Sequence, residues 1–337
     1  MAIQNCAKLI LSLLFSGATF VVMAAENPFL GQWELTIPGG AAGWLSVEQR
    51  NGLPQGSMMW GTGSVVPVDS IKVEGDRLLL TRKYQVERTD ASGKKSRVNL
   101  VDNISAKIEG DRLLLTSTKP DDNAQGRQKK ESFSGKRQPV LPPAPDLSQV
   151  KFGEPINLFN GKDLMGWRLT DSSAVNGWSA KDGMLVNDPL QEDGKPHKNY
   201  GNLRTDREFE DFNIKLDVRL NKDQNSGIYL RGIYEVQVAD TFGRPTSFQN
   251  MGAIYSRIKP SAAAEKPPGE WQTFDITLVQ RHVTVELNGK KIIDNQPLMG
   301  STGGALWSDV SKPGPIYFQG DHTAVSYRSI VLRPVVK

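Results

Sequence analysis

The stretch DQNSGIYLRGIYEVQVADTFG, residues 223–243, decides the fold of the second half of this chain. It opens on a turn around QNSG and continues as two short runs in which apolar and polar residues alternate. Side chains of a β-strand point to opposite faces in turn, so each run has one apolar row and one polar row. The pattern predicts two adjacent strands with one face in the core and the other carrying polar groups.

The polar face of this predicted pair has two interpretations. Antiparallel sheets commonly have one face in water, where cross-strand ion pairs are ordinary, and spacing alone favours such a face. The composition favours a sugar site instead, because an arginine, a carboxylate, an amide and a phenol occur without any lysine from residue 224 to 243. Such a mixture suits directional hydrogen bonds to hydroxyls. The residues concerned are Tyr229, Arg231, Glu235 and Gln237.

The rest of the second half is also patterned as strands. Residues 212–220, FNIKLDVRL, alternate cleanly between apolar and polar. Turn signals stand at Asp182-Gly183 and at Asn288-Gly289, and a further strand junction is expected around Arg281-His282. Trp167, Trp178 and Trp271 are expected in the core. Strands without helical crossovers predict an antiparallel, two-sheet jelly roll with a concave face.

The first half contains an internal repeat. VEGDRLLLT, residues 73–81, recurs as IEGDRLLLT at residues 108–116, and each copy has the strand–turn–strand pattern of a β-hairpin. A small antiparallel β-barrel or sandwich fits this half, in which no catalytic constellation is found. The apolar, glycine-rich residues 58–68 suit either core packing, which is favoured, or a ligand pocket.

The N-terminal residues suggest an exported protein, and a proline-rich segment divides the chain into two halves. Lys8 precedes an apolar run from Leu9 to Met23 and then Ala24-Ala25, which is the plan of a signal peptide. Residues 137–150 are proline-rich and predict an extended linker. We therefore expect a signal peptide at 1–24, a small all-β domain at 26–136, the linker, and a jelly roll at 151–337, in a periplasmic or secreted protein.

Composition excludes several classes of function. The formal net charge of +4 over 337 residues includes no long basic block, which argues against nucleic-acid binding. No second apolar run reaches membrane-spanning length. The only cysteine, Cys6, lies in the leader, so a nucleophilic cysteine is excluded from the mature chain. Neither a serine-hydrolase elbow nor a phosphate-binding loop is present.

Residues 152–336 resemble the 3-keto-disaccharide hydrolase domain family, which has a concanavalin-like jelly roll. The resemblance depends on the joint order of several motifs, and one mild departure is Gln272 where the family more often has Asn. The motifs are LFNGKDLMGW (158–167), GWSAKDGML (177–185), NSGIYLR (225–231), YEVQVAD (234–240), GAIY (252–255), GEWQTFDI (269–276), LNGK (287–290) and PIYFQGDHTAVSYRSI (315–330).

The resemblance implies cleavage of glycosides already oxidised at C3, by elimination and hydration or by hydrolysis. Such a reaction needs a base for the C2 hydrogen, a group that stabilises the enolate oxygen, and an acid for the leaving group. The catalytic candidates are Glu235, Arg231 and His322, with Asp321 or Asp240 orienting the imidazole. The substrate-binding candidates are Asn225, Gln237, Asp240, Tyr255, Gln319, Asp321 and Trp307, the last of which suits stacking on a sugar ring.

Two alternatives stay open at this point. The jelly roll also serves carbohydrate-binding proteins without turnover, because a fold does not determine a function. A conventional glycosidase would need a second carboxylate facing Glu235 at roughly 5–10 Å. A divalent metal is possible, since Glu235, Asp240, Asp321 and His322 are suitable ligand types, but no cofactor is certain. The expected partner is a glycoside or oligosaccharide; the sequence leaves the oligomeric state open.

Overall fold

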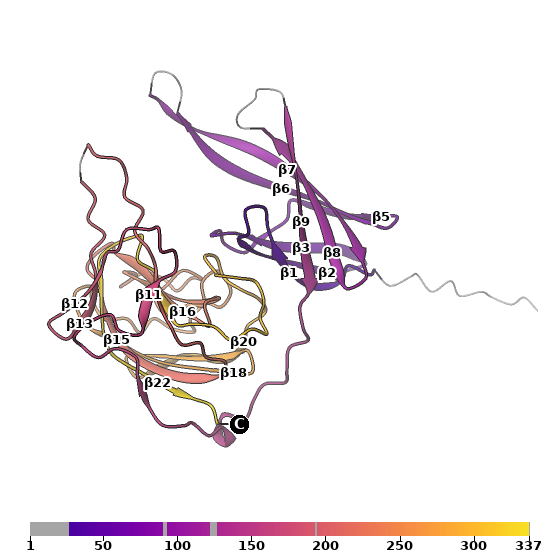
Figure 1. The fold of residues 1–337 in the computed structure, drawn as a ribbon. Helices are drawn as coiled ribbons and strands as arrows, with labels where there is room; N and C mark the ends of the chain where they lie inside the picture. The colour runs from indigo at the N-terminus through magenta and orange to yellow at the C-terminus, as the bar shows by residue number, and fades with distance from the viewer. Residues whose placement is uncertain (1–26, 90–92, 122–126, 193, 337) are drawn as a thin grey trace, which may run out of the picture.

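The computed structural model describes residues 27–89, 93–121, 127–192 and 194–336. In this part of the chain the strands form three antiparallel sheets (Figure 1). The predicted signal peptide lies outside the described residues. Over the same ranges, no helix has the length and apolar character that a membrane crossing needs.

The first nine strands form one continuous sheet, which we call the barrel, in the order β4-β3-β2-β1-β9-β8-β7-β6-β5. The sheet curls strongly, so that a Cβ added at Gly56 of β3 would lie 3.1 Å from Ile71 of β5. The edge strands β4 and β5 do not pair among the described residues, which makes the barrel open. Its strands are β1 (Gly31–Thr36), β2 (Ala42–Arg50), β3 (Leu53–Trp60), β4 (Val66–Pro67), β5 (Ser70–Glu74), β6 (Arg77–Thr89), β7 (Lys95–Glu109), β8 (Arg112–Pro120) and β9 (Gln128–Arg137).

The repeated motif forms the two predicted hairpins. β5 and β6 pair with Glu74 opposite Arg77, and β7 and β8 pair with Glu109 opposite Arg112. In each turn a glycine, Gly75 or Gly110, has a positive φ near 60° that disfavours larger residues. The favoured core interpretation of residues 58–68 is confirmed for Met58 and Met59, both of which are buried.

The second half forms two sheets, which we call the sandwich. One sheet has the order β12-β13-β22-β15-β18-β19-β20, with β10 also pairing β22, and the other has the order β11-β14-β21-β16-β17. Their strands are β10 (Ile156–Asn157), β11 (Trp167–Leu169), β12 (Trp178–Lys181), β13 (Met184–Asn187), β14 (Leu203–Thr205), β15 (Phe212–Arg219), β16 (Asn225–Leu230), β17 (Tyr234–Ala239), β18 (Gln272–Val279), β19 (His282–Leu287), β20 (Lys290–Pro297), β21 (Tyr317–Phe318) and β22 (Val325–Pro334).

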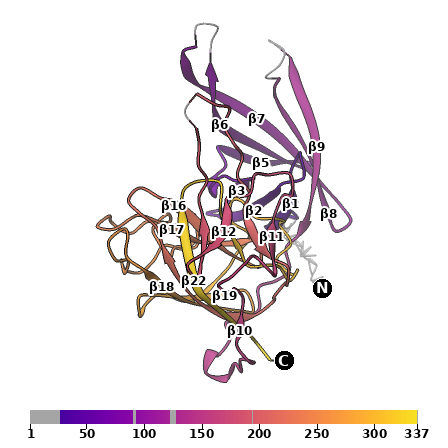
Figure 2. The same ribbon diagram turned by 60° about the vertical axis from the view of Figure 1, so that its left-hand side comes forward.

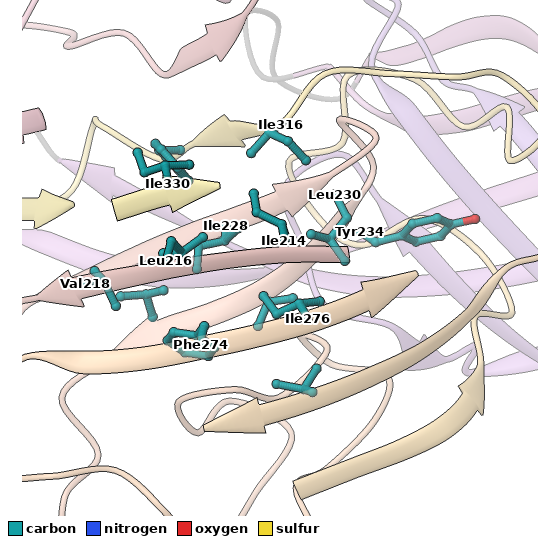
Figure 3. Packing of buried hydrophobic residues seen from close by; sticks show 14 of the residues in the cluster. Ile214, Leu216, Val218, Ile228, Leu230, Tyr234, Phe274, Ile276, Ile316 and Ile330 are labelled. Carbon is teal, nitrogen blue, oxygen red and sulfur yellow. The ribbon is translucent and has the colours of Figure 1, made fainter. Parts of the chain in front are cut away.

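The core of the sandwich lies between the inward rows of its two sheets. Alternate residues of β15, such as Ile214 and Leu216, meet Ile228 and Leu230 of β16, as Figure 3 shows. Burial of these apolar rows removes them from water and is the main stabilising term of such a fold. The all-β prediction and the jelly-roll architecture are confirmed.

Two of the three tryptophans expected in this core are there. Trp167 and Trp178 are buried and pack on Phe318. Trp271 is only partly buried, and the guanidinium groups of Arg219 and Arg328 lie 4.7 and 4.0 Å from the centroid of its ring. The core prediction was therefore wrong for Trp271, whose indole faces cations on the outer surface of the sheet.

The segment between barrel and sandwich is extended apart from one 3₁₀ turn, η1 (Leu147–Gln149). It is held to the sandwich because Arg281 donates to the carbonyl of Pro139, and Asn295 donates to that of Pro145. The barrel contacts the sandwich through strands β1 to β3 (Figure 2). Glu34 of β1 accepts from the backbone N–H of Val310, and Trp44 of β2 donates to the carbonyl of Met299. The predicted proline-rich connector thus runs along the sandwich surface between the two units.

Candidate active site

The five-stranded sheet has the two faces that residues 223–243 predict. Tyr229 of β16 stands opposite Glu235 of β17, and Gly227 stands opposite Gln237. The alternate residues, including Ile228 and Val236, join the hydrophobic core. Tyr317 of β21 pairs with Tyr229, which extends the polar face by one strand. The pleat thereby gathers carboxylate, amide and phenol groups from three strands.

Glu235 is the centre of this face. Its side chain is almost entirely buried, and it occupies the space above Gly227, where an added Cβ would lie 2.5 Å from Oε1. The hydroxyl of Tyr229 lies 3.0 Å from Oε2. With its amide nitrogen turned toward the carboxylate, Gln237 donates to Oε1 at 3.2 Å. Glycine on the facing strand is therefore what makes room for the acid.

The environment of Glu235 favours its protonated form. Burial raises the pKa of Glu235 to about 8, although the hydrogen bond from Tyr229 and the charge of His322 act in the opposite direction. A carboxyl group with a pKa near neutrality can exchange a proton at physiological pH, as general acids and bases must. Perturbed acids of this kind cluster at functional sites.

Two stacked tyrosines hold the acid in place. The rings of Tyr229 and Tyr317 lie 3.9 Å apart and nearly parallel. Their hydroxyls donate to the carbonyls of Gly303 at 2.7 Å and Gly304 at 2.5 Å. Burial raises the pKa of both phenols well above the ordinary value, so both stay neutral. Tyr229 has one hydroxyl proton for two acceptors, the Gly303 carbonyl and Glu235.

His322 and Asp321 form a hydrogen-bonded pair on the loop that follows β21, and both act electrostatically on Glu235. The Nδ1 atom of His322 lies 2.8 Å from Oδ1 of Asp321, and both side chains are nearly half exposed. The hydrogen bond that His322 donates to Asp321 raises the pKa of His322, and the charge of Glu235 adds to this effect. The structure thus brings Glu235, Asp321 and His322, distant in sequence, within electrostatic reach of one another.

Arg231 is not brought to this cluster. It lies in the turn after β16 with a positive φ of 55°, and its guanidinium donates to the carbonyls of Val310 and Lys312. The side chain is buried there, and its hydrogen bonds go to loop carbonyls and not to Glu235. Its place is that of a structural cation, which satisfies loop carbonyls inside the sandwich.

The predicted substrate-binding residues divide into two groups. Asn225 and Gln237 lie on the polar face of the sheet, and Gln319 follows Tyr317 in the same row, next to Gly227. The Oε1 atom of Gln319 is buried without a hydrogen-bond partner among the described residues. Tyr255 borders this group, because its backbone N–H donates to the carbonyl of Glu235.

Asp240 and Trp307 belong to the second group, away from Glu235. Asp240 accepts from the backbone N–H of Asp223, so it stabilises the turn before β16 and does not orient His322. One face of Trp307 is covered by the ammonium group of Lys312 at 3.9 Å. Trp307 lines a pocket of about 430 Å³ between barrel and sandwich.

Three parts of this site lie outside the residues that the sequence predicts for it. Tyr317 shares the alternation of its strand, a signal that could have placed it beside Gln319. Gly303 and Gly304 form a glycine pair, for which a close backbone approach is a common reason. The contact of Ser64, in the barrel, with Tyr255 carries no sequence signal at all.

The ligand types expected for a metal do not converge. Within the ranges that the structure describes, no three His, Cys, Asp or Glu side chains come together in a group that could hold a metal ion. Asp240 lies apart, and the remaining candidates are Glu235, Asp321 and His322. The arrangement provides two groups that can exchange protons, Glu235 and His322, beside a row of hydrogen-bonding side chains.

The fold of the sandwich and a family model together define a carbohydrate-active protein. A family model described as the 3-keto-alpha-glucoside-1,2-lyase-like domain matches residues 154–333. The chain therefore belongs to this family, and the resemblance seen in the sequence is confirmed. The search of curated proteins gave no match.

Several solved structures are similar to this chain over part of its length. Two are each described as a "putative glycosyl hydrolase" from Parabacteroides distasonis: one has 22% identity, covers 54% of this chain and 94% of its own, with a TM-score of 0.46. The other has 29% identity, covers 58% and 94%, with a TM-score of 0.44. SCLam, a non-specific endo-beta-1,3(4)-glucanase from family GH16, has 11% identity, covers 59% and 93%, with a TM-score of 0.33.

Proposed function

We propose that this protein is an exported enzyme that cleaves glycosides carrying a ketone at C3. The observation that carries the proposal is a buried Glu235, with a pKa raised to about 8, beside the Asp321–His322 pair. The description of the family as 3-keto-alpha-glucoside-1,2-lyase-like supports the choice of substrate class. The signal-peptide pattern of residues 1–24 supports export to the periplasm or the medium.

The proposed reaction is an elimination followed by a hydration. The C3 ketone acidifies the C2 hydrogen, and a base removes this proton to give an enolate. The enolate then re-forms the ketone, a C1=C2 double bond is made, and the C1–O bond breaks with its electron pair leaving on oxygen. That oxygen takes up a proton from an acid. Water then adds across C1=C2, with hydroxyl at C1 and hydrogen at C2, and completes the net hydrolysis.

The roles follow from burial and exposure. Glu235 acts as the base in its ionised form, because a buried carboxylate with a high pKa has a strong affinity for a proton. His322 acts as the proton donor, since Asp321 stabilises its imidazolium and its side chain is reached by solvent. Asn225, Gln237, Gln319 and Tyr255 bind the sugar hydroxyls. Arg231 has no part in this mechanism because its donors are used by backbone carbonyls.

Turnover of a 3-keto-glucoside by the purified protein tests the proposal. We expect release of the aglycone from the oxidised substrate and none from the parent glucoside. Glu235→Gln should lower kcat by at least about 100-fold, the scale of general acid–base catalysis. Glu270→Gln, at an exposed turn, is the matched control and should keep full activity.

Two other outcomes would replace the proposal. Equal activity on the unoxidised glucoside would identify a conventional two-carboxylate glycosidase, for which Asp321 would be the second acid. Saturable binding of the 3-keto-glucoside without any turnover would identify a carbohydrate-binding protein. Unchanged kcat in Glu235→Gln would remove that residue from the mechanism.

A further inference from the structure

The barrel touches the sandwich at the loop that holds the two site tyrosines. Residues 60–65, which comprise the last residue of β3 and the loop after it, pack against residues 299–304 of the sandwich. The backbone N–H of Gly304 donates to the carbonyl of Gly61 at 3.2 Å. A Cβ added at Gly303 would lie 2.6 Å from the carbonyl oxygens of both Thr62 and Gly63. The two loops are therefore in contact so close that only glycine fits.

A second contact reaches the segment beside Glu235. The hydroxyl of Ser64 donates to that of Tyr255 at 3.2 Å, and the backbone N–H of Val65 donates to Ser256 at 2.7 Å. Tyr255 is joined in turn to the backbone of Glu235, at 3.0 Å. A predicted substrate-binding side chain of the sandwich is thus oriented by a serine of the barrel.

A third contact anchors the start of the same sandwich loop. The indole N–H of Trp44, on β2, donates to the carbonyl of Met299 at 3.1 Å. The guanidinium of Arg257 lies 4.2 Å over the Trp44 ring and donates to the carbonyl of Ser301. Trp44 therefore stabilises both the 299–304 loop and the guanidinium of Arg257.

These contacts are connected to Glu235 through the two site tyrosines. Residues 303 and 304 offer their carbonyls to Tyr229 and Tyr317, and Tyr229 lies against Glu235. We propose that the barrel is a positioning element of the active site, in which Trp44, Ser64 and the 60–65 loop hold the 299–304 loop and Tyr255 in their working geometry. The inference rests on the proposed function for its kinetic readout, although not for its spectroscopic one.

The shared proton of Tyr229 gives this role a specific signature. With residues 299–304 in place, the Gly303 carbonyl competes with Glu235 for that proton. When the loop is loosened, the hydroxyl turns fully to the carboxylate and stabilises its charge, which lowers the pKa of Glu235. The other titratable groups that face Glu235 belong to the sandwich and stay unchanged in barrel variants: they are Tyr317, Asp321, His322 and Tyr327.

The experiment compares barrel variants in the full-length protein. Trp44→Phe removes the N–H to Met299 but keeps a ring under Arg257, and Ser64→Ala removes the hydrogen bond to Tyr255. Ile104→Val is the control, because it loosens the barrel core away from the junction. We expect kcat/KM for the 3-keto-glucoside to fall about fivefold in each variant, the effect of one neutral hydrogen bond. The control should keep the kinetics of the unmodified protein.

The pKa of Glu235, followed by carbon-13 NMR of the side-chain carboxyl, provides a readout that needs no turnover. It should be lower in Trp44→Phe than in the unmodified chain, with the acid limb of the pH–rate profile shifted the same way. An equal pKa in the two proteins overturns the inference. If the unmodified chain cleaves no 3-keto-glucoside, the proposed function fails, and the NMR titration still decides the role of the barrel.

Discussion

The raised pKa of Glu235 depends on its two neighbours on β16, Gly227 and Tyr229. Neither of these residues carries a positive charge that would stabilise the carboxylate. The side chain takes the space that a Cβ at position 227 would fill, and Tyr229 gives it only part of one hydrogen bond. Burial outweighs the hydrogen bond from Tyr229 and the charge of His322, and the pKa of Glu235 rises to about 8. The same pairing of acid and glycine makes position 227 sensitive to substitution.

Gly227→Ala should lower kcat with little change in fold. The added methyl would lie 2.5 Å from Oε1, so the carboxylate must move by about an ångström. Displacements of that size cost on the order of 10- to 100-fold in rate. Steady-state kinetics of the variant check this against Gly153→Ala, whose nearest neighbour would be a side chain at 3.3 Å far from the site. Wild-type kcat in Gly227→Ala would contradict the packing argument.

The buried acid should also make stability depend on pH. An unfolded Glu235 ionises around its ordinary pKa of 4.5, whereas the folded one keeps its proton up to about 8. The unfolded state therefore binds fewer protons between these values, and the protein loses stability as pH rises from about 4.5 to about 8. The neutral amide of Glu235→Gln escapes this loss.

The difference in thermal midpoint between Glu235→Gln and the unmodified chain should be smallest near pH 4.5 and grow toward pH 8. It corresponds to a few kcal/mol at most, since each unit of pKa difference is about 1.4 kcal/mol. A pH-independent difference would mean that the carboxyl is already ionised in the folded state at pH 5.

At the scale of elements, both the barrel and the sandwich are built from β-hairpins. A polar side chain buried within them needs a hydrogen-bond or ion-pair partner. On β7, Asp102 is fully buried and is hydrogen-bonded to Ser117 of β8. Arg82 of β6 pairs with the same carboxylate at 3.3 Å and stacks over Trp60 at 4.3 Å. One cation thus connects three strands of the barrel.

Arg82→Met should destabilise the barrel by about 3 kcal/mol, because removal of one partner leaves a buried charge unpaired. Chemical unfolding followed by tryptophan fluorescence measures the loss. Arg97→Met, at an exposed position of β7, is the matched control and should change stability by less than about 0.5 kcal/mol. Equal stability of the two variants would show that Asp102 is satisfied by Ser117 alone.

At the scale of the whole molecule, charged pairs join the barrel to the sandwich. Lys136 of β9 lies 2.9 Å from Asp309 and 3.4 Å from the buried Glu34, which accepts from the backbone N–H of Val310. Burial opposes the ionisation of Asp309, but hydrogen bonds from Ser311 and Lys136 outweigh it and lower the pKa to about 2. Asp309 therefore keeps its charge down to low pH, whereas burial raises the pKa of Glu34.

Asp309→Asn should weaken the junction by about 1 kcal/mol at neutral pH, since partial exposure screens the pair. A depressed pKa contributes stability above the unfolded value of 3.8, and this contribution is lost as pH falls through about 2. The thermal midpoints of the variant and the unmodified chain should accordingly differ at pH 7 and converge near pH 2. A constant difference across this range would contradict the assigned role of the ionised carboxylate.

The sequence by itself determined the strands, their turns and which side chains share a face. These properties follow from local rules, namely the two-residue period of a strand and the turn preferences of Gly, Asn and Asp. They were enough to place Glu235 and Gln237 on one polar face and to assign the jelly roll. The hairpins of the 35-residue repeat were found for the same reason.

Only the tertiary structure decided which groups meet. In the sequence, Arg231 follows the alternation of the strand. In the structure its positive φ takes it out of the strand, and its guanidinium donates to the backbone carbonyls of a loop. Tyr317 and His322 reach Glu235 because β21 pairs with β16, and Ser64 reaches Tyr255 because the barrel docks on the sandwich. Such contacts join residues tens to hundreds of positions apart, and long-range packing, which no local period encodes, selects them.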